Sequence, residues 1–176
     1  MFDENKVRPL IRTIKDWPKA GVDFLDITPL LKVPESMTLV ITALAELFPN
    51  KKITHIGALE ARGFIFGAQL AYYMKLPLIP FRKKGKLPYQ CINKTYDLEY
   101  GKATLEIHVD AFGAGDSILL VDDVIATGGT LLAAAALCKE LKANVIGAAS
   151  VISLSALPGS KALAEANISV ESLIAI

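Results

Sequence analysis

Two adjacent carboxylates followed by a loop of small residues form the stretch of this sequence best suited to chemistry. Asp122 and Asp123 follow the apolar run Ile118-Leu119-Leu120-Val121, and the loop Ala126-Thr127-Gly128-Gly129-Thr130 comes directly afterwards. Glycines let backbone N–H groups approach an anion, and the start of a helix adds the positive end of its dipole. Carboxylates repel phosphate, so the two acids need hydroxyl groups or a metal ion in front of them. A phosphate on the loop and hydroxyls on the acids together describe a ribose 5-phosphate.

The residues around this stretch predict its place in a fold. The apolar run is typical of a strand buried on both faces of a parallel sheet, and residues 129–142 are typical of an apolar helix. Such strands end at the edge where α/β folds bind ligands. The loop is not a Walker A motif, because no Lys precedes Thr130 and the glycine spacing differs. The alternative is a plain strand–turn–helix with a capping Thr; the two acids favour a binding site.

Two further strand ends carry candidate anion-binding residues. Glu60-Ala61-Arg62-Gly63 follows a predicted strand and precedes a predicted helix, and its glycine permits close approach of the backbone to an anion. Arg82-Lys83-Lys84-Gly85-Lys86 follows the next strand and suits a pyrophosphate, which needs several cations. The alternatives are an ordinary helix N-terminus with a surface Arg, and a solvated basic loop.

Weaker candidates lie in two segments with aromatic residues. The stretch Tyr96-Asp97-Leu98-Glu99-Tyr100-Gly101 belongs to a predicted antiparallel ribbon, and Glu99 is a candidate for proton transfer or charge stabilisation there, or an ordinary solvent-facing acid. Trp17 and Phe24 lie in a predicted loop at residues 17–29, where we expect packing onto the core in preference to stacking on a ligand. His55 and His108 lack partner spacing for a metal and are predicted to be structural.

Composition limits the class of protein. With 176 residues, of which 52% are hydrophobic, the chain is expected to form a single domain, residues 1–176, with a full core. A formal net charge of +1 gives no reason to expect nucleic-acid binding. We find no apolar run long enough for a membrane span and no secretory signal. Cys91 and Cys138 lack metal-ligand spacing, Cys138 is expected to be a core thiol, and a cytoplasmic location is predicted.

Strands and helices are predicted to alternate along most of the chain, which indicates an α/β fold with a doubly wound, mostly parallel sheet. Strands are expected at residues 53–59, 76–81, 95–100, 104–109, 117–121, 145–152 and 170–176. Helices are expected at residues 4–15, 35–48, 64–74, 129–142 and 158–166, with Pro34 at the start of the second and Pro9 inside the first.

Taken together, these stretches closely resemble the type I phosphoribosyltransferase family, and specifically its adenine-using, purine-salvage members. The matching pieces are residues 18–28, 60–64, 82–88, 96–101, 105–108 and 121–130. Residues 121–130 indicate phosphoribosyltransferases broadly, whereas Glu60-Ala-Arg-Gly-Phe64 and Tyr96-Asp-Leu-Glu-Tyr-Gly101 are more specific to the adenine enzymes. The resemblance implies a mostly parallel sheet flanked by helices, a small hood at about residues 1–33 and a flexible β-ribbon lid.

The resemblance also implies a Mg²⁺-dependent reaction, in which adenine and 5-phosphoribosyl 1-pyrophosphate give AMP and pyrophosphate. The metal would be held mainly by substrate, near Asp122 and Asp123, and the protein is expected to be a homodimer. The implied 5-phosphate and ribose residues are Asp122, Asp123, Ala126, Thr127, Gly128, Gly129 and Thr130. Those implied for pyrophosphate are Glu60, Ala61, Arg62, Arg82, Lys83 and Lys86, with a cis peptide between Glu60 and Ala61. Asp23, Phe24 and Arg62 would bind adenine, and Glu99 and Tyr100 would act from the lid.

Two positions depart from the family pattern and keep alternatives open. Asp23 stands where an aliphatic residue is usual, and Leu25 where an Arg is common, so base preference is the least secure expectation. A 6-oxopurine enzyme would need a donor such as Lys near the base, but residues 131–137 after the loop are only Leu and Ala. A DNA-binding regulator built on this fold would need an added basic domain, for which the chain has no room.

Overall fold

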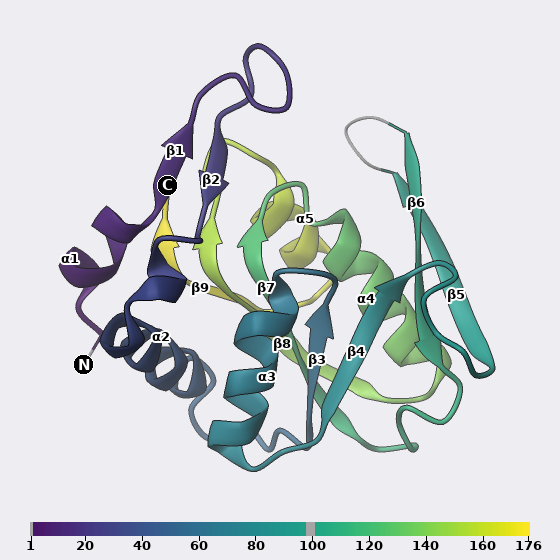
Figure 1. Cartoon of the computed structure of the whole chain (residues 1–176). Helices are drawn as coiled ribbons and strands as arrows, with labels where there is room; N and C mark the ends of the chain where they lie inside the picture. The colour runs from purple at the N-terminus through teal and green to yellow at the C-terminus, as the bar shows by residue number, and fades with distance from the viewer. Residues whose placement is uncertain (1, 98–100) are drawn as a thin grey trace.

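A seven-stranded sheet with the order β5-β6-β4-β3-β7-β8-β9 organises the chain in this computed structural model, which describes residues 2–97 and 101–176 (Figure 1). The parallel strands are β4 (Leu78–Lys83), β3 (His55–Leu59), β7 (Ser117–Ile125), β8 (Asn144–Ser153) and β9 (Val170–Ala175). An antiparallel ribbon of β5 (Cys91–Asp97) and β6 (Lys102–His108) continues the sheet beyond β4. The predicted α/β fold with a mostly parallel sheet is confirmed.

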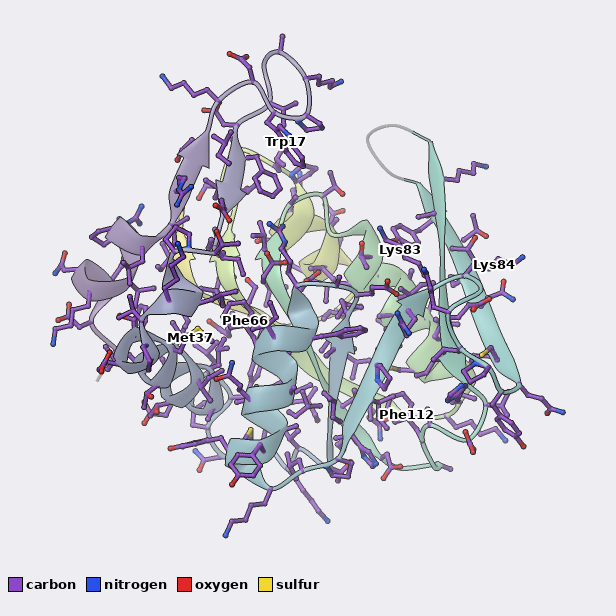
Figure 2. All side chains as sticks on the ribbon, in the orientation of Figure 1. Trp17, Met37, Phe66, Lys83, Lys84 and Phe112 are labelled. Carbon is purple, nitrogen blue, oxygen red and sulfur yellow. The ribbon has the colours of Figure 1, made fainter. Side chains whose placement is uncertain are left out.

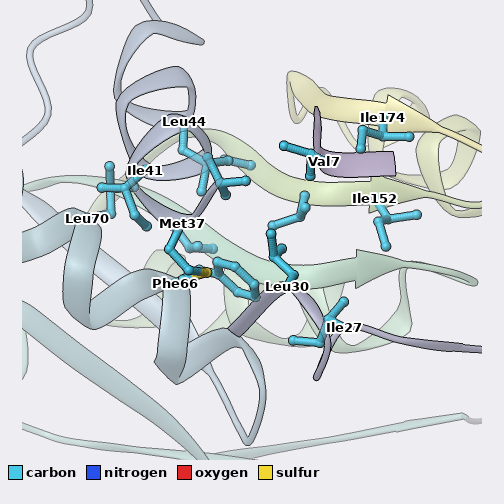
Figure 3. Packing of buried hydrophobic residues seen from close by; sticks show 14 of the residues in the cluster. Val7, Ile27, Leu30, Met37, Ile41, Leu44, Phe66, Leu70, Ile152 and Ile174 are labelled. Carbon is cyan, nitrogen blue, oxygen red and sulfur yellow. The ribbon is translucent and has the colours of Figure 1, made fainter. Parts of the chain in front are cut away.

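Helices cover both faces of this sheet, and a separate apolar cluster fills each interface. α2 (Pro34–Glu46) and α3 (Gly63–Met74) pack on one face, where Met37 and Ile41 of α2 lie beside Phe66 and Leu70 of α3 (Figure 3). α4 (Gly129–Glu140) and α5 (Gly159–Glu165) contribute to the cluster on the other face. These clusters fix the sheet, and the sheet in turn fixes the loops at its edges.

The strand after which the acids were expected is longer than predicted. β7 continues through Asp122 and Asp123 to Ile125, because it stays paired with the ten-residue strand β8, with Asp122 opposite Ser150. β4 likewise includes Arg82 and Lys83. The acids and the first basic residues therefore lie on the last part of their strands and are held by the sheet rather than by a loop.

The prediction of one N-terminal helix over residues 4–15 is wrong. The helix α1 (Glu4–Val7) gives way to a 3₁₀ turn η1 (Arg8–Leu10), and residues Arg12–Ile14 form the strand β1. Pro9 has no N–H to continue the helix. β1 pairs with β2 (Phe24–Asp26), which lies inside the segment expected to be an irregular loop. This two-stranded ribbon occupies the part of the chain where the small hood was expected.

The two cysteines are free thiols, and the predicted core position of Cys138 is confirmed. Burial raises the pKa of the Cys138 thiol to about 12. Within the described residues, no helix is long and apolar enough to cross a membrane.

Candidate functional site

The carboxyl ends of β3, β4 and β7 meet at one edge of the sheet, because these neighbouring strands are parallel. Figure 1 shows this edge lying between the loop that joins β1 to β2 and the far end of the β5–β6 ribbon. Three groups of predicted site residues converge there. They are the turn at residues 60–63, the acid pair at the end of β7 and residues 126–130, here called the phosphate loop.

Arg62 and Asp123 form an ion pair at the centre of this edge. Nε of Arg62 lies 2.8 Å from Oδ2 of Asp123, and Nη1 of Arg62 donates to the backbone oxygen of Leu25 at 3.2 Å. The Asp123 side chain is almost fully buried, yet its Oδ2 accepts no hydrogen bond of good geometry within the described part of the chain. The contact is therefore electrostatic, and a buried carboxylate oxygen keeps unused acceptor capacity beside the site.

Asp122 is held close to the turn at residues 60–63. A Cβ atom on Gly63 would lie 2.9 Å from both Oδ1 of Asp122 and the backbone oxygen of Val121, so the turn approaches β7 this closely only with glycine. Burial, and then the adjacent charge of Asp123, raise the pKa of Asp122 well above its usual range. Burial also raises the pKa of Asp123, although the charge of Arg62 opposes this. The pair is thus two carboxylates held together at an electrostatic cost.

The phosphate loop presents donors that have no partner in the protein. Gly128 has φ of +81°, which favours glycine, and α4 begins at the next residue. In residues 2–97 and 101–176, the N–H groups of Thr127 and Gly128 have no hydrogen-bond acceptor. Buried or semi-buried N–H groups are rarely left unpaired. An anion seated at this helix N-terminus would satisfy them.

A contact that the sequence did not predict ties the phosphate loop to the ribbon. Thr130 donates from Oγ1 to the phenolic oxygen of Tyr96, on β5, at 3.2 Å. The ring of Tyr96 packs against the apolar cluster under α4. Thirty-four positions separate the two residues, and only the family-like stretch around Tyr96 marked it as notable.

The structure brings Glu60 and Arg82 together beside the turn at residues 60–63. The predicted cis peptide between Glu60 and Ala61 is confirmed. Oε2 of Glu60 accepts from the backbone N–H of Lys83 at 2.9 Å and from Nε of Arg82 at 3.2 Å. Burial alone would raise the pKa of Glu60, but these hydrogen bonds and the nearby cations lower it. Glu60 therefore acts as an anchor for β4.

Arg82 is held by hydrogen bonds within the protein, whereas the side chains of the neighbouring lysines extend into solvent. Nη1 of Arg82 donates to the backbone oxygen of Lys86 at 3.3 Å and closes the basic loop, whereas the side chains of Lys83, Lys84 and Lys86 are exposed (Figure 2 labels Lys83 and Lys84). The exposed ammonium groups of these lysines remain open to an anionic ligand.

The aromatic residues of the hood gather over Arg62. The guanidinium carbon of Arg62 lies 4.9 Å from the centre of the Phe24 ring. The Trp17 ring packs edge-on against the same ring, with 4.5 Å between the two ring centres. Trp17 is 50% exposed and lies at the base of the loop that joins β1 to β2 (Figure 2), so the expectation that both aromatics pack on the core is wrong. The β1–β2 ribbon stands away from the sheet and leaves Trp17 outside the core.

The two unusual hood residues have separate explanations. The side chain of Asp23 is exposed, which leaves its backbone available to a ligand. Leu25 is buried in the apolar cluster beneath the hood, where a charged side chain would be costly.

The remaining candidates lie outside this arrangement. Glu99 and Tyr100 fall outside the described residues. His55 faces Thr54 and Asp116, with its Nδ1 2.9 Å from the Thr54 hydroxyl, at the opposite edge of the sheet. His108 ends β6, away from the acid pair. The structural roles predicted for both histidines are consistent with these positions.

Across the described residues, no three His, Cys, Asp or Glu side chains converge as a metal-binding group. Asp122 and Asp123 nevertheless offer hard carboxylate oxygens, although Oδ2 of Asp123 is buried beside Nε of Arg62. Mg²⁺ prefers such oxygens and often keeps waters or ligand phosphates as its other ligands. The acid pair therefore fits a magnesium ion that a phosphorylated ligand supplies with most of its coordination.

Comparisons with known proteins agree on one family. The family model described as phosphoribosyl transferase domain matches residues 26–168. The chain is 49% identical over 168 residues to a curated adenine phosphoribosyltransferase of Stutzerimonas stutzeri, covering 96% of this chain and 92% of that protein. It is 47% identical over 175 residues to the enzyme of the same name from Pseudomonas paraeruginosa, covering 99% and 96%.

Solved structures give the same answer. A crystal structure of adenine phosphoribosyltransferase from Thermoanaerobacter pseudethanolicus superposes with a TM-score of 0.95 at 41% identity, covering 99% of this chain and 100% of the other. The Saccharomyces cerevisiae enzyme, complexed with adenine and an imino-altritol bisphosphate, has a TM-score of 0.90 at 37% identity, with 97% of each chain covered. The Trypanosoma brucei enzyme, complexed with AMP, pyrophosphate and ribose-5-phosphate, has a TM-score of 0.87 at 25% identity, covering 97% of this chain and 78% of the other.

The raised pKa of Asp122 predicts that its ionised carboxylate lowers the stability of the folded protein at neutral pH. The pKa of Asp122 is raised in the folded protein from its usual 3.8, so folding favours the protonated carboxyl. The stability that this side chain contributes is therefore fully present below pH 3.8 and is lost as the pH rises through the folded-state pKa. Asp122→Asn should therefore unfold at a higher temperature than wild type at pH 7, by about 2–4 °C for each kcal/mol gained. The unfolding temperatures of the two proteins, measured by circular dichroism, should become equal as the pH is lowered toward 4.

The matched control is Asp110→Asn, which changes an exposed acid away from the pair. It should leave the unfolding temperature within about 1 °C of wild type at every pH, as expected of a surface substitution. An Asp122→Asn protein that is less stable than wild type at pH 7 contradicts the electrostatic account of the pair.

Proposed function

Because the chain belongs to the phosphoribosyltransferase family, among its adenine phosphoribosyltransferases, we propose that its sheet edge makes AMP and pyrophosphate from adenine and 5-phosphoribosyl 1-pyrophosphate. The observation that carries the proposal is the acid pair beside a loop with unpaired N–H donors. The reaction transfers a pentosyl group in purine salvage. We propose that residues 1–176 act as one domain, with the hood at about residues 1–33.

The donor substrate is proposed to lie along β7 and the phosphate loop. Its 5-phosphate accepts from the N–H groups of Thr127 and Gly128 and from the hydroxyl of Thr127. The hydroxyl of Thr130 can also donate to it once that hydroxyl turns away from Tyr96. Its ribose hydroxyls donate to Asp122 and Asp123, which relieves the repulsion between the two carboxylates. The remaining loop residues, Ala126 and Gly129, contribute backbone alone.

The pyrophosphate is proposed to lie over the turn at residues 60–63. The backbone at Ala61 lies in this turn, the cations of Arg82, Lys83 and Lys86 lie at the end of β4 and in the basic loop after it, and Glu60 keeps Arg82 and β4 in place. Departure of pyrophosphate leaves an oxocarbenium-like ribose and a polyanion. The cations stabilise the polyanion and the acid pair stabilises the cationic ribose, so both charges that develop in the transition state are matched.

Adenine is proposed to bind between Phe24 and Arg62. At 4.9 Å from the Phe24 centroid, the guanidinium leaves no space for a second ring, so Arg62 must move aside as the base stacks. The backbone of Asp23 then reads the edge of the base while its side chain stays in solvent. We propose that Glu99 and Tyr100 close over the reacting atoms from the ribbon and exclude water, which would otherwise hydrolyse the donor.

We propose Mg²⁺ as the cofactor, with Asp122 and Asp123 as the protein groups nearest to it. Their carboxylate oxygens match its preference, and Oδ2 of Asp123 becomes accessible to it if Arg62 moves away. When bound, the ion neutralises charge on the departing pyrophosphate.

A homodimer in the cytoplasm is proposed as the working form. Tyr72, which is 89% exposed, and Tyr73 line a groove of about 350 Å³ between α2 and α3. Large aromatics are enriched at protein interfaces, so this groove supports pairing of two copies. Free cysteines are the usual state in the reducing cytoplasm. We propose no nucleic-acid or membrane partner.

The base used by the enzyme is tested by competition. Adenine, hypoxanthine, guanine and xanthine are supplied in parallel with 5-phosphoribosyl 1-pyrophosphate, and nucleotide and pyrophosphate release are followed. We expect AMP from adenine and at least about 100-fold lower rates with the 6-oxopurines, since mispaired polar groups cost this much. Preference for a 6-oxopurine overturns the assignment of the hood, and absence of turnover with every base overturns the enzymatic function.

The metal requirement is tested by chelation. EDTA in excess over Mg²⁺ should abolish AMP formation, and added Mg²⁺ should restore it, because the charge on pyrophosphate then lacks its main counterion. Binding of free adenine, measured by calorimetry, should be unchanged by EDTA. Full turnover in EDTA contradicts the proposed cofactor.

The oligomeric state is tested by sedimentation equilibrium. Wild type should have twice the chain mass of 18.9 kDa, and the double variant Tyr72→Glu, Tyr73→Glu should sediment as a monomer, since buried charges disfavour the contact. Tyr89→Glu, at an exposed tyrosine away from the groove, is the control and should remain dimeric. A monomeric wild type refutes the proposed dimer.

A further inference from the structure

The phosphate loop rests against a second glycine that is far from it in sequence. Gly159, the first residue of α5, donates its N–H to the backbone oxygen of Ala126 at 3.0 Å. A Cβ atom on Gly159 would overlap that same oxygen and lie 2.9 Å from the backbone nitrogen of Gly128. A Cβ atom on Gly128 would in turn lie 3.0 Å from the backbone oxygen of Gly159. Two backbones therefore touch here, with no space for a side chain on either.

This contact sets the direction of the peptide between Ala126 and Thr127. The described cis peptides are elsewhere, at Trp17–Pro18 and Glu60–Ala61, so this peptide is trans. In a trans peptide the C=O and N–H bonds point in opposite directions. Because the carbonyl of Ala126 faces Gly159, the N–H of Thr127 faces away from α5. That N–H is one of the two that lack an acceptor within the described residues.

We propose that Gly159 is a positioning residue for the 5-phosphate. Its N–H holds the carbonyl of Ala126 away from the anion, and its missing side chain lets the loop sit close enough for this bond. If the hydrogen bond from Gly159 is lost, the peptide between Ala126 and Thr127 can rotate and turn the Ala126 carbonyl oxygen toward the phosphate. The partial negative charge on that oxygen would then repel the phosphate. The inference rests on the proposed role of residues 126–130 as the 5-phosphate site. It gives α5 a part in substrate binding although the helix supplies no ligand of its own.

The test replaces one hydrogen atom by a methyl group. Gly159→Ala should raise the Kd for AMP and the KM for 5-phosphoribosyl 1-pyrophosphate by about 10- to 100-fold, since small displacements of positioning groups have effects of this size. The KM for adenine should stay within about twofold. A merely destabilised protein would lose active fraction and therefore kcat, with both KM values unchanged. Calorimetry with AMP and steady-state kinetics provide these values.

The matched control is Gly113→Ala, in the segment before β7. A Cβ atom there meets only Oδ2 of Asp116 at 3.5 Å, which is an ordinary contact. This variant should bind AMP as wild type does. If wild type binds adenine but not AMP, the proposed 5-phosphate site itself fails. If wild type binds AMP and Gly159→Ala binds it equally well, the positioning role of Gly159 is refuted while the proposed function stands.

Hydrogen exchange on the wild-type protein provides a test that does not depend on the variant folding. The amide of Gly159 should exchange slowly in the free protein, because it is hydrogen-bonded to Ala126. AMP at saturating concentration should slow it by at least about tenfold, because the anion and Gly159 hold opposite sides of one peptide group. An amide that exchanges at the unprotected rate, or whose rate AMP leaves unchanged, refutes the proposal.

Discussion

The close contact between the turn at residues 60–63 and β7 is the constraint on which the site depends. Parallel pairing of β3 with β7, with Ala58 opposite Val121, delivers the turn to the level of the acid pair. Gly63 then lets the two backbones approach to within a distance that any side chain would prevent. One sheet register thereby places the groups proposed for pyrophosphate beside the groups proposed for ribose. The hydrogen bonds of the sheet, and not a flexible loop, set the separation between these two proposed sites.

The electrostatics of this edge follow from the same packing. Asp122 and Asp123 lie within a strand that is paired on both sides, so burial raises the pKa of each. Arg62 compensates part of this cost, and its guanidinium also lies over the Phe24 ring. A single arginine therefore connects the ribose acids to the hood. If Arg62 moves when a base binds, Asp123 loses its ion-pair partner. The hydroxyl groups of the substrate could then donate to the Asp123 carboxylate in place of Arg62.

Much of this arrangement could be predicted from the sequence, because it depends on local patterns. Apolar runs located the strands, Pro34 located the start of α2, and glycines beside acids located the loops at the sheet edge. The secondary structure of residues 4–29 was predicted poorly, because β1 and β2 are three residues each and are stabilised by pairing with one another. The contacts of Tyr96 with Thr130, and of Gly159 with Ala126, join residues more than thirty positions apart. No local pattern encodes such a contact, so it is visible only in the folded chain.

The central claim is that the phosphate loop and the acid pair together form a site for a ribose 5-phosphate. Calorimetric titration of wild type with AMP and, separately, with adenosine tests this most directly, because the two ligands differ only in the phosphate. Hydrogen bonds to a charged group contribute roughly 1.5–3 kcal/mol each, so AMP should bind at least about 100-fold more tightly than adenosine. Equal affinity for the two ligands would show that the loop does not hold the phosphate and would contradict the account.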